Sequence, residues 1–541
     1  MTQKQKTIRL IITIALIISY LVLLSIHHRR NEIIDDAFIT YRYASNLAVG
    51  KGLVFNEGQA VLGTTTPAYA ILLSSFAIFT GSQAIPTISL WINLIATIGI
   101  MVCLGIATYK LSHQSYKLAL LAPLVIFGSI VTLEVMVWGM EGSVLLLMIA
   151  VSIVLLLYRR WLWVCIIAGF TIWLRPEGVF FIGLIGMTLL GMSVQKKMAW
   201  REFLIYGTSL ILPSLLYFLM LIVFYGTLLP QSIISKAGGL YPGEPFGQVN
   251  IVFQYLISPL IFLAGLLTGD INFILTNPTF FIAMIPIALF FLIIGSIQII
   301  KLDRVLWIVP ALLLLNVIFY GSRSTLIFPW YHANYHILVI ILLALGVGQL
   351  IHTILSAMTD KPVLLASAIV SILLVCVPNI LFTPYGQYLQ EARQRHYVSG
   401  HMLEYHDLLV EIGDDIPSDV VVALHEIGYL GFYMRDNLIL DTAGLVSPEI
   451  VDYFPIPLEL RGNDPLNGAI PPQSMLDYQP EVIITLDSFV KYGFYQAEWF
   501  DELYSIAYRV PNVAGFGVTD LSLDVIVLRD QLDRIVIDPN D

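Results

Sequence analysis

Asn31-Glu32-Ile33-Ile34-Asp35-Asp36-Ala37-Phe38-Ile39-Thr40-Tyr41-Arg42 is the stretch of sequence from which both the fold and the function can be argued. It comes a few residues after the first long apolar run of the chain, 11–26. Two adjacent carboxylates, Asp35 and Asp36, therefore lie at the edge of a predicted membrane span. A charge in that position is costly unless it has a partner or a task, so the pair is the first candidate for chemistry.

The composition predicts an α-helical polytopic membrane protein. The 541 residues are 57% hydrophobic and 12% charged, with a mean hydropathy of +0.82, and a soluble chain of this kind would expose large apolar patches. Residues 1–382 hold 20 Lys and Arg against 12 Asp and Glu, whereas residues 383–541 hold 8 against 26. Because an acidic tail repels phosphates, this part of the chain is not expected to bind nucleic acid or anionic lipid headgroups.

Apolar runs of about 17–25 residues predict roughly eleven membrane-spanning helices. Lys and Arg gather in every second loop, and the positive-inside rule then places the N-terminus in the cytoplasm. For this alternation to hold, 67–80 and 249–267 must lie along the outer interface, because the first is too short to cross and Pro259 breaks the second. The predicted spans lie near 8–26, 84–107, 118–137, 142–157, 161–174, 178–192, 203–224, 279–300, 305–321, 335–356 and 362–382.

The chain changes character near residue 382, so we predict a membrane module over 1–382 and an extracytoplasmic α/β domain over 383–541. A helix is predicted over 387–412. Short apolar runs separated by Gly, Pro and Asn predict the strands of a covered sheet. These runs are 420–424, 438–440, 482–486 and 524–528.

The outer loop that follows the first span predicts a short helix over 37–47, with Asp36 as its N-cap or first-turn acid. Asp35 would then remain at the mouth of this helix and face the outer cavity. Partial burial there would raise its pKa and make it a general base. The alternative is that both carboxylates merely cap a helix at the interface.

Several motifs of this sequence together resemble one family. They span most of the chain and occur in the expected order. The likeness is to the GT-C integral-membrane glycosyltransferases, and within them to the terminal arabinofuranosyltransferase-like group. The motifs are 35–44 with 50–58 and 65–67, Trp138-Gly139-Met140-Glu141, Leu174-Arg175-Pro176-Glu177-Gly178, Tyr225-Gly226-Thr227-Leu228-Leu229-Pro230 with Lys236, Glu426-Ile427-Gly428-Tyr429-Leu430-Gly431, and 440–446.

This resemblance implies an inverting glycosyltransferase of the cytoplasmic membrane. Its donor would be a sugar carried on a polyprenyl phosphate, and its acceptor a glycan, lipid or protein on the outer face. Asp35, supported by Asp36, would correspond to the catalytic acidic pair, and Glu141 to a second acidic position that orients the acceptor or helps to hold a cation. Arabinofuranose is the best-known donor sugar of the family, but no sugar pocket can be identified in this sequence.

A departing lipid phosphate needs cationic partners, and few are expected on the outer side. Lys236 is the first choice, because an ammonium tolerates a flexible phosphate. Arg175, Arg323 and Arg42 are the further candidates, since a guanidinium can grip two oxygens. For each of them the alternative is a cation that only extends to the membrane surface.

The spacing of His332 and His336 could put two imidazoles on one helix face, as in a metal site. The sequence offers no third ligand, so we interpret both as interfacial residues, with an acceptor or phosphate contact of His332 as the minor alternative. No metal site and no certain cofactor is predicted, and dependence on a divalent metal stays open.

Two other classes of function fit a chain of this kind. A transporter or flippase of lipid-linked sugars also needs many helices, but it usually places charges near the middle of the membrane and in repeated halves, neither of which occurs in this sequence. A non-catalytic glycan-assembly factor could have the same fold, and an Asp35→Asn exchange would then leave its phenotype unchanged.

Overall fold

The computed structural model describes residues 33–111, 138–241, 249, 252–253, 256, 278–323, 328–358, 400–461, 469–515 and 518–537. The spans predicted near 8–26, 118–137 and 362–382 lie outside the described residues. So do nearly all of 249–267, the first part of 387–412, and the domain boundary near residue 382.

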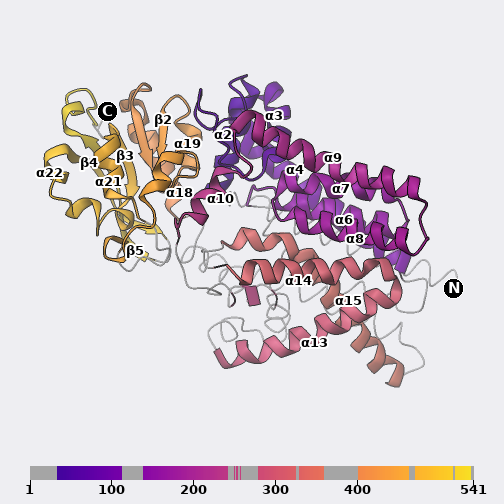
Figure 1. Cartoon of the computed structure of the whole chain (residues 1–541). Coiled ribbons are helices and arrows are strands. Elements are labelled where there is room, and N and C mark those ends of the chain that lie inside the picture. The colour runs from indigo at the N-terminus through magenta and orange to yellow at the C-terminus, as the bar shows by residue number, and fades with distance from the viewer. Residues whose placement is uncertain are drawn as a thin grey trace.

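The membrane module consists of long apolar helices that lie side by side (Figure 1). Contacts join α4 to α6, α7 to α9, α8 to α14 and α13 to α15. Most of these helices match the predicted runs within a few residues. Their bounds are α4 Ile85–Leu111, α6 Gly142–Leu157, α7 Trp161–Leu174, α8 Gly178–Val194, α9 Trp200–Tyr225, α13 Pro278–Leu302, α14 Ile308–Gly321 and α15 Ala333–Met358.

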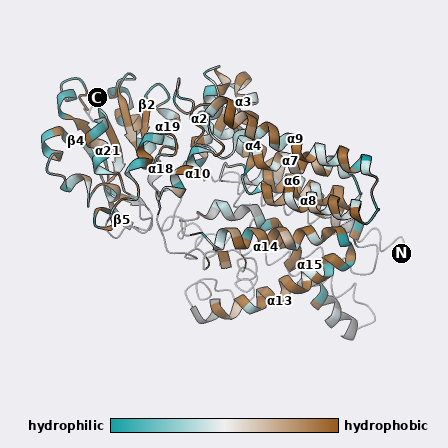
Figure 2. Ribbon diagram, in the orientation of Figure 1, coloured by the Kyte–Doolittle hydropathy of each residue, from teal (hydrophilic) through white to brown (hydrophobic). Residues whose placement is uncertain are grey.

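Four helical segments in the described part are long and apolar enough to cross a membrane: Ser82–Ala107, Trp200–Tyr225, Ile282–Leu302 and Arg304–Gly321. Figure 2 shows that apolar residues extend along most of the module. Much of this apolar surface is exposed, and on α9 it includes Leu215 and Val223, at 58% and 64%. Hydrocarbon, rather than water, is the solvent that such a surface suits. The chain is a membrane protein, whereas the count of eleven spans and the cytoplasmic N-terminus stay predictions.

The first outer loop folds into two helices, α2 Asp35–Ala48 and α3 Pro67–Thr80. They pack against each other, and α3 also contacts α4 and α7. The bounds of α3 equal those of the predicted interfacial segment, and Pro67 begins it at a position where a missing N–H costs nothing. The helix α2 starts two residues earlier than predicted, so that Asp35 and Asp36 form its first turn.

The C-terminal residues form an α/β domain around one five-stranded sheet with the order β2-β1-β3-β5-β4. Strands β1 Val421–Leu424, β2 Leu438–Asp441 and β3 Val482–Leu486 are parallel, and β5 Val518–Leu528 joins β3 in antiparallel register. The edge strand β4 Tyr504–Gly515 escaped prediction. Its sequence is not a continuous apolar run and contains Pro511, which only an edge strand tolerates.

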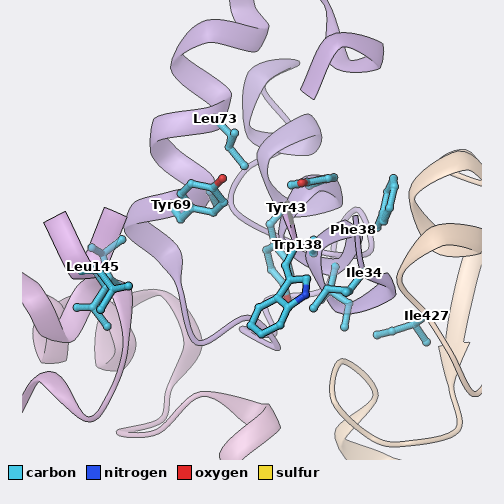
Figure 3. Close-up of a cluster of buried hydrophobic side chains, with 14 of the residues drawn as sticks. Ile34, Phe38, Tyr43, Tyr69, Leu73, Trp138, Leu145 and Ile427 are labelled. Carbon is cyan, nitrogen blue, oxygen red and sulfur yellow. The ribbon is translucent and has the colours of Figure 1, made fainter. Parts of the chain in front are cut away.

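The domain docks directly on α2 through apolar and aromatic side chains. Figure 3 shows Ile427 reaching from the domain toward Ile34, which precedes α2. The ring of Phe38 lies 5.0 Å from that of Tyr429 and 5.6 Å from that of Phe432, both in the short helix α19 Tyr429–Tyr433. This contact brings the β1–α19 connection next to the Asp pair.

Candidate active site

A hollow that is partly open to solvent, with about 770 Å³ of empty space, lies between the first outer loop and the ends of helices of the membrane module. Segments far apart in the sequence form its wall: the first outer loop, the α7–α8 turn, the short helix α10 Gln231–Ala237, the end of α14, and the 3₁₀ helix Pro329–His332. Its lining residues are Thr65, Arg175, Pro176, Glu177, Ser232, Ile233, Lys236, Ala237, Phe319, Tyr320, Arg323 and Tyr331. Three of the four cations predicted to bind phosphate are among them.

Lys236 reaches the hollow from α10. Its Nζ donates a hydrogen bond to the Tyr331 hydroxyl at 2.5 Å and lies 4.8 Å from the centre of that ring. Burial opposes the charge, but the Tyr331 hydroxyl and the Asp36 carboxylate together raise the pKa of Lys236 above its ordinary value. Lys236 therefore remains an ammonium at neutral pH.

Arg175 is held rigidly at the C-terminal end of α7. Its Nη1 donates to Glu141 Oε1 at 2.9 Å, and its Nε lies 4.0 Å from Glu177 Oε2. The guanidinium carbon lies 4.7 Å from the centre of the Tyr331 ring. With side-chain exposures of 3% and 2%, Arg175 and Glu141 form a buried ion pair, and removing one partner of such a pair is strongly destabilising.

The turn before α6 brings Glu141 to this pair. Gly139 has a φ of +75°, and a Cβ at this position would lie 2.3 Å from the Tyr41 hydroxyl. The carbonyl oxygen of Gly139 accepts hydrogen bonds from Tyr41 and Tyr69 at 2.8 and 3.1 Å. The geometry makes Glu141 a partner of Arg175, and a direct contact of Glu141 with an acceptor stays a proposal.

Arg323 is the exposed cation of the hollow. Its guanidinium carbon lies 4.2 Å from the centre of the Phe319 ring. Within the described ranges no acidic side chain forms a salt bridge with it. Its N–H groups are therefore the most accessible of the three cations to an incoming anion.

The two adjacent carboxylates face different partners. Asp35 accepts backbone hydrogen bonds from Gly428 at 3.1 Å and from Tyr429 at 2.7 Å, one on each oxygen. Asp36 lies instead within the electrostatic reach of Lys236 and Arg175. Burial raises the pKa of Asp36 and Glu426 raises it further, whereas the two cations lower it. Asp36 is thus a carboxylate within the electrostatic reach of two cations of the hollow.

Arg42 lies away from the hollow and is 1% exposed. Its guanidinium donates to the main-chain carbonyls of Phe55, Gly431, Met434 and Asn437, and also to Asn56 Oδ1. These bonds tie α2 to the C-terminal domain. Because its N–H groups serve fixed protein acceptors, we leave Arg42 out of the phosphate-binding group proposed below.

His332 ends the 3₁₀ helix Pro329–His332, and its side chain lies outside the described residues. His336 is buried in α15 at 2% exposure. Among the residues that the structure describes, no group of three or more His, Cys, Asp or Glu could hold a metal ion.

Sequence reasoning missed the roles of two residues. Tyr331 binds Lys236 and lies under Arg175, but in the sequence it is one aromatic residue among several. Glu426 was noted only as part of a motif, yet its charge acts on Asp36. A separation of 390 residues hides this relation from any local pattern.

Comparison with known proteins finds one solved structure with a similar fold and one matching domain family. The crystal structure of ArnT from Cupriavidus metallidurans bound to undecaprenyl phosphate is similar over 95% of this chain and 97% of that chain, with a TM-score of 0.53 and 12% sequence identity. Residues 390–520 match a domain of unknown function, DUF8728. No curated protein matches by sequence. At this identity the comparison shows that the two chains share a fold.

Proposed function

We propose that this chain is an inverting glycosyltransferase that uses a sugar carried on a polyprenyl phosphate. One observation carries the proposal: Lys236, Arg175 and Arg323 line one hollow, and a half-buried carboxylate, Asp36, lies within the electrostatic reach of two of them. Cations suit the phosphate of such a donor, and a carboxylate suits the hydroxyl of an acceptor. The fold shared with ArnT, whose structure holds undecaprenyl phosphate, supports a lipid phosphate as the ligand.

The proposed reaction is a single displacement. Asp36 removes the proton from an acceptor hydroxyl while that oxygen forms a bond to the anomeric carbon. The bond between the anomeric carbon and the phosphate oxygen breaks, and its electron pair leaves with the lipid phosphate. Lys236 and Arg323 balance the charge that this phosphate gains, with Arg175 held behind them by Glu141. The configuration at the anomeric carbon inverts because the acceptor oxygen attacks the face opposite the departing phosphate.

The finer assignments extend this proposal. We assign the chain to the arabinofuranosyltransferase-like group, with a pentofuranose as the first donor sugar to test and a glycan, lipid or protein as the acceptor. The hollow and the C-terminal domain would lie on the outer face of the cytoplasmic membrane. The motifs around Asp36, Arg175 and Lys236 support the group, and the distribution of Lys and Arg supports the orientation.

Reconstitution tests the function directly. The purified full-length chain is placed in liposomes with a panel of polyprenyl-phosphate sugars and candidate acceptors, and release of polyprenyl phosphate is measured together with the glycosylated product. The wild-type chain should release one lipid phosphate for each sugar transferred, and Asp36→Asn should lower kcat by roughly 10²–10⁴-fold, the usual contribution of a general base. Equal turnover by both chains contradicts the mechanism.

The same liposomes separate the rival functions. A flippase would move the intact lipid-linked sugar between leaflets, so that the donor would be translocated without loss of its phosphate. A non-catalytic assembly factor would bind a glycan without consuming the donor. Either result with the full panel would replace the proposed activity.

A further inference from the structure

The connection between β1 and α19 carries an acidic residue, Glu426, to the interface with the membrane module. The strand β1 ends at Leu424, and Glu426 follows two residues later. Two residues beyond it lies Gly428, and the backbone N–H groups of Gly428 and Tyr429 donate hydrogen bonds to the Asp35 carboxylate. Since Asp36 is the next residue after Asp35, the hydrogen-bonded geometry brings Glu426 close to the carboxylate on the hollow side.

The backbone around Glu426 is fixed in this position. A Cβ on Gly428 would lie 2.0 Å from the main-chain oxygen of Asp35, so the two segments are in direct contact. Arg42 holds the other end of α19 through the carbonyls of Gly431 and Met434. The Glu426 side chain is itself oriented by α18 Gly400–Ile412, from which the Tyr405 hydroxyl donates to Glu426 Oε2 at 2.5 Å.

Two carboxylates within electrostatic reach of each other in a half-buried interface oppose each other's ionisation. Such an arrangement is typical of sites in which one carboxylate has to accept a proton. Charged and titratable groups of several elements act on the pair. They are Lys236 and Arg175 on the side of the hollow, and Asp35, Glu404, Tyr241, Tyr405 and His425 around Glu426.

We infer that Glu426 is a positioning residue of the catalytic centre, contributed by the C-terminal domain, and that it acts on the proton-accepting carboxylate, Asp36. This inference rests on the proposed function and deepens it. The C-terminal domain then completes the catalytic centre, rather than only covering it. A chain whose domain is displaced would retain the cationic hollow and lose the strength of its base.

The first test is the pH profile of kcat/KM for Glu426→Gln in the reconstituted full-length chain. Removing the negative charge lets Asp36 ionise more easily, so its pKa falls and the acid limb of the profile moves to lower pH. As a weaker base, Asp36 also gives a lower plateau. Asp501→Asn, which removes an exposed charge in α22 Phe500–Leu503 of the same domain, serves as the control and should keep the wild-type profile. A lower plateau without a shift of the acid limb indicates a structural role only and overturns the inference.

The second test needs no turnover. Cys103, Cys165 and Cys376 are replaced by Ala, Asp36 is replaced by Cys, and the rate of alkylation of the new thiol is followed against pH with and without Glu426→Gln. A shift of half a pKa unit would accelerate alkylation about threefold near neutral pH, because only the thiolate reacts. An unchanged rate overturns the inference even if the wild-type chain transfers sugar. Absence of turnover in the wild-type chain counts against the proposed function, and the catalytic role of Glu426 falls with it even if the thiol responds.

Discussion

Asp35 and Asp36 differ in their partners, and we expect them to differ in their effects. Asp35 accepts hydrogen bonds from two backbone N–H groups of the C-terminal domain, whereas Asp36 lies within the electrostatic reach of Lys236 and Arg175. Asp35→Asn retains one carbonyl acceptor and should lower kcat by less than about tenfold, equivalent to one hydrogen bond of roughly 1 kcal/mol. Asp36→Asn should cost at least ten times more than this. Steady-state rates of the two variants under identical conditions provide the measurement, and a larger loss for Asp35→Asn would restore Asp35 as the base.

At the scale of elements, the contact between α19 and α2 decides whether the site is assembled. Gly428→Ala places a Cβ 2.0 Å from the Asp35 carbonyl oxygen and 2.5 Å from its Oδ2. We expect the domain to separate from α2, with faster proteolysis of the C-terminal domain and a loss of transfer activity. Gly413→Ala is the matched control, since its Cβ would meet only Leu409 at 3.9 Å. Equal proteolysis of the two variants would show that this contact does not hold the domain.

A second pair of elements, α13 and α15, approaches closely at two glycines. A Cβ on Gly295 would lie 1.9 Å from the Leu342 carbonyl oxygen, and one on Gly346 would lie 2.2 Å from that of Phe291. Small residues allow this close backbone packing between membrane helices. Gly346→Ala should destabilise the chain by about 1–3 kcal/mol, the usual range for overpacking, and should lower Tm in detergent. Gly183→Ala in α8 meets no atom within 4 Å and should not lower Tm; an unchanged Tm for Gly346→Ala would mean that the two helices lie further apart.

At the scale of the whole molecule, a ligand of the hollow should stabilise the entire chain by mass action. Undecaprenyl phosphate at 100 times its Kd should add about 2.7 kcal/mol to the free energy of unfolding and raise Tm. Lys236→Ala removes a charged hydrogen-bond donor, so Kd should rise roughly tenfold or more, and the added stability should fall to about half or less at the same concentration. Lys51→Ala is the control, because Lys51 lies in the first outer loop and forms a salt bridge with Glu57, with 2.9 Å between Nζ and Oε2. Equal shifts for both variants would remove Lys236 from the phosphate site.

Elements whose signals are local could be predicted from the amino acids alone. Apolar runs gave α6, α7 and α8 within two residues of their observed bounds, because the length of a lipid-facing helix follows from hydropathy alone. The parallel strands β1, β2 and β3 were predicted for the same reason, since a strand covered on both faces is a continuous apolar run. Lys236, Arg175 and Arg323 were named as one group from residue chemistry and the expected side of the membrane.

Which chemical groups meet depends on how distant elements pack in the folded chain. Asp35 and Asp36 are adjacent and identical in type, so no local pattern can tell which faces the hollow; the docking of α19 separates them. Residue chemistry made Arg42 a candidate phosphate ligand. In the folded chain its N–H groups instead donate hydrogen bonds to main-chain carbonyls of α19 and of the loop that follows it. Glu426, 390 residues away in the sequence, comes within electrostatic reach of Asp36. Hydropathy and strand pattern act over a few neighbouring residues, whereas charge and hydrogen bonding act between whichever atoms the packing of distant elements brings together.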